Sequence, residues 1–382
     1  MTMPLDTELL RLKLGRLRDQ LKTSLEEVSA ATGIPVGTLV ALESGQRQPT
    51  GDEVLILADY YKCDYRFLIS NEQLTAYEQT ERMFRKHGEQ FSKEDRWAVQ
   101  EFLFLCDCEE WALRELGRTA TQPFTAVIEG RFYKGHAERA ASDLRRHLGY
   151  APQEVPKDVY RDFRRLGLHV FRRRLGNSSI SGLSVRHPLA GNCILVNYSE
   201  DVYRQRFTAA HEAAHALLDR QDFVVSFERW DPKDLSEIRA HTFAARYLLP
   251  PDFLARIPDP RSWSPDRVLE WAERLEVNPP TLAYALRDAG LVSERDAKRY
   301  QSVKVLASAK SDPELAGGLS PRSLERKNHL LSVGLSQSYV GLCFDAYDAG
   351  LVSAARVAEM MLASEGELAE LAELFGRRPG RG

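Results

Sequence analysis

The sequence predicts a multidomain, mainly α-helical protein with a smaller α+β region at its centre. Three observations support this fold class. Leucines recur at helical spacing near the N-terminus, short β-like runs cluster between residues 169 and 197, and the last third returns to helical periodicity. A chain of 382 residues is long enough for two or three domains with a sizeable core.

The composition is that of an ordinary globular protein, with 43% apolar and 28% charged residues. The formal net charge of −3 gives the whole chain no electrostatic bias toward nucleic acid or anionic membranes. No run of about 18 apolar residues occurs, so we expect no membrane span. The N-terminus lacks a secretory pattern, and the five cysteines include no CxxC pair, so we expect reduced thiols and a cytoplasmic protein.

Residues 1–70 are predicted to form a small all-α domain. The leucines at helical spacing are Leu10, Leu14, Leu17 and Leu21. Ser24 and Glu27 have the spacing of a capping box, which predicts the start of the next helix. Gly33 ends that helix, and Pro35 suits the first turn of another that runs to about Gly45. Two short helices around a glycine-bearing turn form a helix-turn-helix pattern.

This segment resembles the N-terminal DNA-binding domain of the XRE (Cro/cI-like) repressors. The resemblance is carried by Leu-Glu-Glu-Val at 25–28, Ala-Thr-Gly-Ile at 31–34, Thr-Leu at 38–39, Leu-Glu-Ser-Gly at 42–45 and Arg-Gln-Pro at 47–49. It covers about 60 residues and implies a domain that can bind DNA. Arg16, Arg18 and Arg47 are then the candidates for nucleic-acid contacts.

The predicted recognition helix departs from that family where DNA would be read. It opens with Pro35, Val36 and Gly37, and none of these side chains can donate a bidentate hydrogen bond to a base. Glu26 stands where these domains usually place a glutamine near a phosphate. Residues 1–70 hold eight Lys and Arg against ten Asp and Glu. Two interpretations stay open: weak or partner-assisted DNA binding, and a helical module that binds protein.

Residues 71–125 are predicted to form a helical linker, and residues 126–258 a mixed α+β domain with a small sheet. The expected elements of that domain are a basic helix at 137–148, strands at 169–172, 180–185 and 194–197, and a helix at 207–220. The strand at 194–197 is either an edge strand that receives substrate or an internal core strand. Arginines at 161–165 and 172–174 form a basic cluster, either a solvated face or a site for an acidic partner.

We expect a catalytic metal site at His211-Glu-Ala-Ala-His215. Two histidines four residues apart share one helical face, so both imidazoles can bind one metal ion. Glu212 lies next to the first histidine and can take a proton from a water that the metal activates. This is the HExxH arrangement of zinc peptidases.

A catalytic zinc also needs a third protein ligand and an open fourth position. Glu237 lies downstream in a predicted helix that runs from residue 235 to 250, with apolar residues at helical spacing. Glu237 and His241 are four residues apart, so both can point at the metal. The ligand types indicate zinc, while manganese and iron stay open.

Residues from about 137 to 250 resemble the ImmA/IrrE metallopeptidase domain. The matching segments are 137–148, 180–182, 194–197, 204–208, the HEAAH helix, 237–245 and 248–250. The resemblance implies a gluzincin-like site with His211, His215 and Glu237 on zinc and Glu212 as general base. It also implies site-specific cleavage of a partner repressor that is itself XRE-like.

One position departs from this second family, which usually has Asn or Asp where this chain has His241. Three roles stay open for His241: a hydrogen bond that orients His211, a contact to substrate or oxyanion, and a metal ligand. Tyr203, Arg206 and Tyr247 are further candidates for substrate or oxyanion contacts.

The C-terminal third is predicted to be helical. Residues 259–310 form a helical extension, and residues 311–382 form a helical module with a disordered tail. This region could sense a signal, form a homodimer or recognise substrate.

The sequence therefore predicts a cytoplasmic zinc endopeptidase that cleaves a specific regulatory protein, an XRE-like repressor or antitoxin, in a stress- or phage-related switch. The alternative is a DNA-binding transcription regulator whose zinc domain senses or binds without proteolysis. A third interpretation is an autoinhibited protease whose N-terminal domain mimics its substrate.

Overall fold

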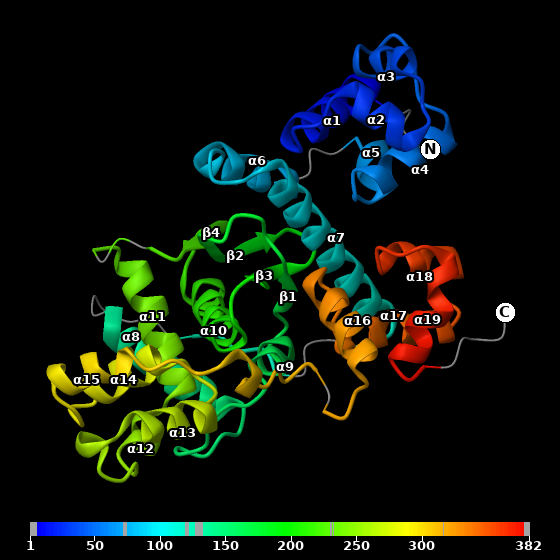
Figure 1. The fold of residues 1–382 in the computed structure, drawn as a ribbon. Helices are drawn as coiled ribbons and strands as arrows, with labels where there is room; N and C mark the ends of the chain where they lie inside the picture. Colours follow the sequence, from blue (N-terminus) through cyan, green and yellow to red (C-terminus); the bar gives the residue numbers. More distant parts are fainter. Residues whose placement is uncertain are drawn as a thin grey trace.

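The computed structural model describes residues 6–71, 75–118, 122–126, 133–229, 231, 233–315 and 317–377. The protein is mainly helical, with one four-stranded sheet in its central region, as the sequence predicts (Figure 1). All but the first residue of the predicted tail, 377–382, lies outside the described residues. Across the described ranges, no helix is long and apolar enough to cross a membrane.

The N-terminal helices form the predicted helix-turn-helix domain. They are α1 (Thr7–Gln20), α2 (Leu25–Thr32), α3 (Val36–Glu43), α4 (Gly51–Tyr60) and α5 (Tyr65–Ile69). Ser24 and Glu27 form the predicted capping box at the start of α2. Gly33 ends α2 in the left-handed region, with φ of 75°, which costs glycine little. Pro35 lies one position earlier than predicted, because its extended ψ of 141° makes it the N-cap of α3.

The segment predicted as a linker contains two helices, α6 (Thr75–His87) and α7 (Lys93–Glu115), and a capping box at Ser92 starts the second. One side of α7 holds the helix-turn-helix domain. Nη1 of Arg96 donates to the backbone oxygen of Gln20 at 2.8 Å, and Trp97 packs against the core of that domain. The other side of α7 packs on the central sheet. This helix therefore joins two parts of the molecule through direct contacts.

The sheet contains β1 (His169–Arg173), β2 (Ile180–His187), β3 (Gly191–Asn197) and β4 (Phe223–Phe227). Their order is β1-β3-β2-β4; β1 runs parallel to β3, and the other two pairings are antiparallel. Because β3 is internal, the edge-strand interpretation of residues 194–197 is wrong and the core-strand interpretation is confirmed. The edge next to β2 belongs to β4, a strand that was not predicted because a short apolar run directly after a helix is ambiguous.

Alternation along the strands gives the sheet two buried faces. Val170, Ile194 and Val196 point into one core, and Phe171 and Leu195 point into the other. The first core contains α8 (Tyr133–His147), α9 (Val159–Arg165), α10 (Val202–Leu218), α11 (Leu235–Leu248), α12 (Pro251–Leu254), α13 (Pro265–Leu275), α14 (Pro279–Asp288) and α15 (Glu294–Gln301).

The second core unites α7 with the C-terminal helices. These are α16 (Pro321–Ser332), α17 (Gln337–Asp348), α18 (Ala354–Met360) and α19 (Leu368–Leu374), and short 3-10 turns lie at η1 (Pro260–Ser262), η2 (Ala307–Ala309) and η3 (Glu365–Glu367). All five cysteines are buried, and none forms a disulfide with a described residue. The expected domain boundaries stay predictions, but the packing shows that segments far apart in the chain share each core.

Two arginines of the basic cluster expected at 161–165 and 172–174 form ion pairs with acidic residues of the same chain. Arg172 is almost fully buried and places Nη1 2.6 Å and Nη2 2.9 Å from the carboxylate of Asp312. Glu314 lies 2.9 Å from Arg172 and 2.6 Å from Arg164. A buried charge is costly unless it is paired, so these contacts fix the segment before α16 against β1 and α9.

We predict that Gly182→Ala destabilises the central domain. A Cβ at this position of β2 would lie 2.8 Å from Cγ2 of Thr208 and 2.9 Å from the backbone oxygen of Leu195. The oxygen belongs to a sheet strand and cannot move aside, so overpacking should cost about 1–3 kcal/mol. Calorimetry should show a lower melting temperature. Gly317→Ala is the control, because no atom lies within 4 Å of its Cβ position; equal melting of the two variants would contradict the prediction.

Candidate metal centre

Helix α10 places His211, Glu212 and His215 in the core of the central region. Asp201 starts it by accepting the backbone N–H groups of Tyr203 and Arg204. The helix begins five residues before the predicted start at 207, because this cap precedes it. Small side chains at Ala209, Ala210, Ala213 and Ala214 are buried and leave room for close packing against α11 and the sheet.

Three of the predicted ligands meet at one point. Nε2 of His211 lies 3.0 Å from Nε2 of His215. The two carboxylate oxygens of Glu237, from α11, lie 3.3 Å and 3.4 Å from these nitrogens. All three side chains are buried. In the part of the chain that the structure describes, they are the one group of three or more His, Cys, Asp or Glu side chains able to hold a metal ion.

The donor atoms fit a divalent metal ion. Zinc–nitrogen and zinc–oxygen bonds of about 2.0–2.2 Å separate the ligand atoms of a tetrahedron by about 3.3–3.6 Å. The separations of 3.0–3.4 Å come close to that range. Two imidazoles and one carboxylate form a donor set typical of catalytic zinc, which leaves a fourth position for water or substrate.

The electrostatics of the cluster favour an added cation. Burial lowers the pKa of His211. Burial acts in the same direction on His215, but hydrogen bonds with Asp219 and Glu237 outweigh it and raise the pKa of His215 to about 10. For Glu237, burial is outweighed by hydrogen bonds from the two histidines, so its pKa falls well below the usual range. A metal ion would replace the proton that His215 holds here, so metal binding and proton release are coupled.

Glu212 lies in the same helix and is fully buried. Neither of its carboxylate oxygens makes a hydrogen bond of ordinary geometry with a described residue, although Ser226 lies close enough to lower its pKa. Burial raises the pKa of Glu212 to about 8, although the charge of His215 opposes this effect. Buried polar atoms are normally paired, so an unpaired carboxylate next to the cluster indicates a group that is used in chemistry.

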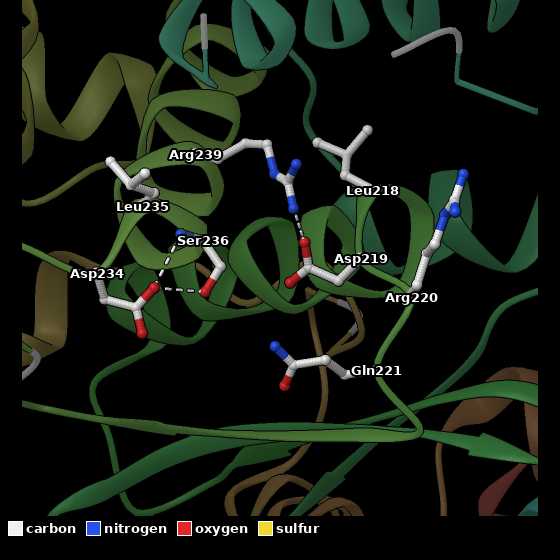
Figure 2. Close-up of a pocket in the computed structure, with 8 residues that line it drawn as sticks. All are labelled: Leu218, Asp219, Arg220, Gln221, Asp234, Leu235, Ser236 and Arg239. Carbon is white, nitrogen blue, oxygen red and sulfur yellow. Dashed lines mark hydrogen bonds and ion pairs between the residues drawn. The ribbon is translucent and has the colours of Figure 1, made fainter. Parts of the chain in front are cut away.

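Asp219 belongs to the site but is not among the predicted residues. Its Oδ2 lies 2.6 Å from Nδ1 of His215, and its Oδ1 pairs with Arg239 of α11 (Figure 2). If Nδ1–H of His215 donates to Asp219, the lone pair of Nε2 stays available for a metal. The signal was present in the sequence, since an acid four residues after a ligand on the same helix shares its face.

His241, for which three roles are open, packs its ring against the cluster. Its ring meets the ring of His211 at an interplanar angle of 71°, with centroids 4.8 Å apart, and it also contacts Phe207. Nδ1 of His211 has no hydrogen-bond partner among the described residues, so His241 does not orient His211 through that atom. Burial lowers the pKa of His241 to about 3, and the charge of His211 acts in the same direction. His241 is therefore neutral.

Tyr203, Arg206 and Tyr247 are buried and make contacts inside the core. Arg206 pairs with Glu276 at 3.0 Å. The hydroxyl of Tyr247 donates to Asp162 at 2.7 Å. These contacts join Arg206 and Tyr247 to neighbouring elements, and a role of the three residues in substrate or oxyanion contacts stays a prediction.

In the helix-turn-helix domain, two of the three arginines considered for nucleic acid are already paired. Nε of Arg18 lies 2.9 Å from Glu43, and Nη1 of Arg47 lies 2.9 Å from Glu53. Arg16 is exposed. DNA contacts through these residues stay a prediction, and the pairing reduces the positive charge available for them.

Comparison with known families bears on both domains. Residues 163–287 match the peptidase M78 family model, described as IrrE N-terminal-like domain. Residues 14–68 match the model described as Helix-turn-helix. The chain is therefore similar to an IrrE-like peptidase domain in its central region and to a helix-turn-helix domain near its N-terminus. The first match spans the whole sheet, α10 and α11, and therefore all residues of the metal cluster. No curated protein matches the chain.

We predict that Asp219→Asn weakens metal binding by about 10- to 100-fold, which is typical when the partner of a ligating histidine is changed. The change removes the charge that fixes the imidazole of His215. Competition with a chromophoric chelator measures the affinity directly. Asp222→Asn, three residues away in an exposed ion pair with Arg82, is the matched control. A metal affinity of Asp219→Asn equal to that of the wild type would show that metal binding does not depend on the contact between Asp219 and His215.

Proposed function

We propose that the protein is a zinc-dependent endopeptidase that cleaves a specific regulatory protein in the cytoplasm. The observation that carries this proposal is the convergence of His211, His215 and Glu237 beside the unpaired carboxylate of Glu212, inside a domain of a metallopeptidase family. Zinc is the ion that this donor set favours, and manganese and iron are alternatives.

A zinc ion bound by these three residues would polarise the scissile carbonyl and activate a water molecule. Glu212 accepts the proton of the attacking water as a carboxylate and returns it to the leaving amine. Its proton affinity suits both steps, because burial brings its pKa to about 8, close to neutral pH. The contact between Asp219 and His215 keeps the imidazole in place throughout.

The outer edge of β4 could bind an extended substrate. Among the described residues, β4 pairs with β2 on one side and with no strand on the other. An extended peptide can add to such an edge through main-chain hydrogen bonds, as in other strand-addition complexes. The scissile bond would then lie between β4 and the cluster, since Glu212 packs against β2 at Gly182, the residue paired with Ser226 of β4.

The substrate we propose is an XRE-like repressor or an antitoxin in a stress- or phage-related switch. The presence of a helix-turn-helix domain on the same chain supports a role in transcriptional control. That domain docks on α7, which covers the sheet face opposite to α10 (Figure 1). This arrangement does not support autoinhibition by a domain that masks the metal cluster.

The second candidate function is a DNA-binding regulator whose metal domain senses without cutting. The helix-turn-helix match favours it, and the position of α3 on the side of its domain away from α7 leaves the recognition helix exposed (Figure 1). A homodimer would suit this candidate as well as the peptidase.

We predict that purified protein with zinc cuts an XRE-like repressor from the same organism into discrete fragments, and that Glu212→Ala reduces the rate at least about 100-fold because the general base is lost. Gel electrophoresis and mass spectrometry measure the fragments. Glu212→Ala should retain its metal, and Glu325→Ala, at an exposed position of α16, is the control. A wild-type protein that shifts DNA but leaves every such repressor intact would favour the second candidate.

A further inference from the structure

Two buried polar side chains beside the metal cluster lack an ordinary hydrogen-bond partner. Ser226 of β4 is 4% exposed, and its hydroxyl oxygen makes no hydrogen bond of ordinary geometry with a described residue. The same holds for both carboxylate oxygens of Glu212 on α10, which is fully buried. Buried polar groups are normally paired, so two unpaired groups at one site indicate that they serve a common purpose.

The alternation of β4 directs Ser226 toward α10. Its neighbours Val225 and Phe227 pack in the core that contains α7, so the side chain between them points to the opposite face of the sheet. Ser226 is paired with Gly182 of β2, and residues paired in this way share a face. A Cβ at Gly182 would lie 3.1 Å from Cγ of Glu212. Ser226 and Glu212 therefore meet beside a position that has no side chain.

A β-bulge in β2 provides this arrangement. The register with β4 shifts between Ile180 and Gly182, which leaves Ser181 as the extra residue. Ile180 and Leu183 both pack in the core of α7 although they are three residues apart, so the two residues between them face α10. Ser181 accepts Nη2 of Arg204 from that helix at 3.2 Å. Bulges next to active sites commonly redirect side chains, and this one turns a glycine toward the general base.

The hydroxyl of Ser226 favours the charged form of Glu212. Burial raises the pKa of Glu212 to about 8, and the charge of His215 and the hydroxyl of Ser226 both act against this effect. A serine hydroxyl rotates freely and can donate one hydrogen bond. Hydrogen bonds to catalytic groups are often loose in the free enzyme and tighten when substrate binds.

We propose that Ser226 is a positioning residue for Glu212, whose carboxylate it holds by donating a hydrogen bond to one oxygen while the other faces the attacking water. The proposal rests on the proposed function, because it adds a residue to the same site. Ser226 keeps its own proton, and the proton of the water passes to the second oxygen of Glu212. A fixed carboxylate avoids the loss of rate that follows when a reacting group is misplaced.

A double-mutant cycle tests the proposal through binding, without cleavage. Zinc-loaded full-length protein is titrated calorimetrically with acetohydroxamate, which binds a metal through two oxygens and donates a hydrogen bond to a neighbouring carboxylate. Ser226→Ala should weaken binding about tenfold, the value of one hydrogen bond to a charged group. Ser226→Thr keeps the hydroxyl and should restore most of the affinity. In a Glu212→Ala background, Ser226→Ala should cause no further loss, as expected for a residue that acts through Glu212.

Ser332→Ala is the matched control, because it removes the hydroxyl of a buried serine in α16 that donates to the backbone oxygen of His329 at 2.7 Å. This control should bind acetohydroxamate as the wild type does. No loss in Ser226→Ala, or an equal loss with and without Glu212, would overturn the proposal. Coupling between Ser226 and Glu212 would support it even if the wild type cut no repressor, a result that would count against the proposed function alone.

Discussion

The site depends on the packing of α10 against α11. This contact brings the carboxylate of Glu237 within 3.4 Å of two imidazoles that lie 22 and 26 residues earlier in the chain. Alanines on the buried face of α10 allow the approach, and the pair formed by Asp219 and Arg239 joins the two helices directly. The same pair fixes one ligand, so helix packing and metal geometry are set by the same contacts.

Local patterns predicted much of the site and part of the fold. The spacing of His211 and His215 and the periodicity around Glu237 depend on one helix each, so the sequence specifies them directly. Capping at Ser24 is equally local. The role of His241 was less predictable, because its neighbours come from another helix and depend on tertiary packing.

Long-range pairing explains what the sequence did not reveal. The acidic partner of Arg172 lies 140 residues away in the chain, and no local pattern connects the two. The position of β3 inside the sheet depends on β1 and β2 on either side of it. The sequence predicts a linker where α7 lies, but this helix forms a core with the sheet and the C-terminal helices. It thereby connects the helix-turn-helix domain to the central sheet (Figure 1).

The metal content of the purified protein tests the central claim most directly, when wild type is compared with Glu237→Ala and His241→Ala by elemental mass spectrometry. Two imidazoles and one carboxylate should hold one ion per chain in the wild type. Loss of that ion in Glu237→Ala and its retention in His241→Ala are the predicted results. Retention in Glu237→Ala together with loss in His241→Ala would contradict the ligand set and the mechanism built on it.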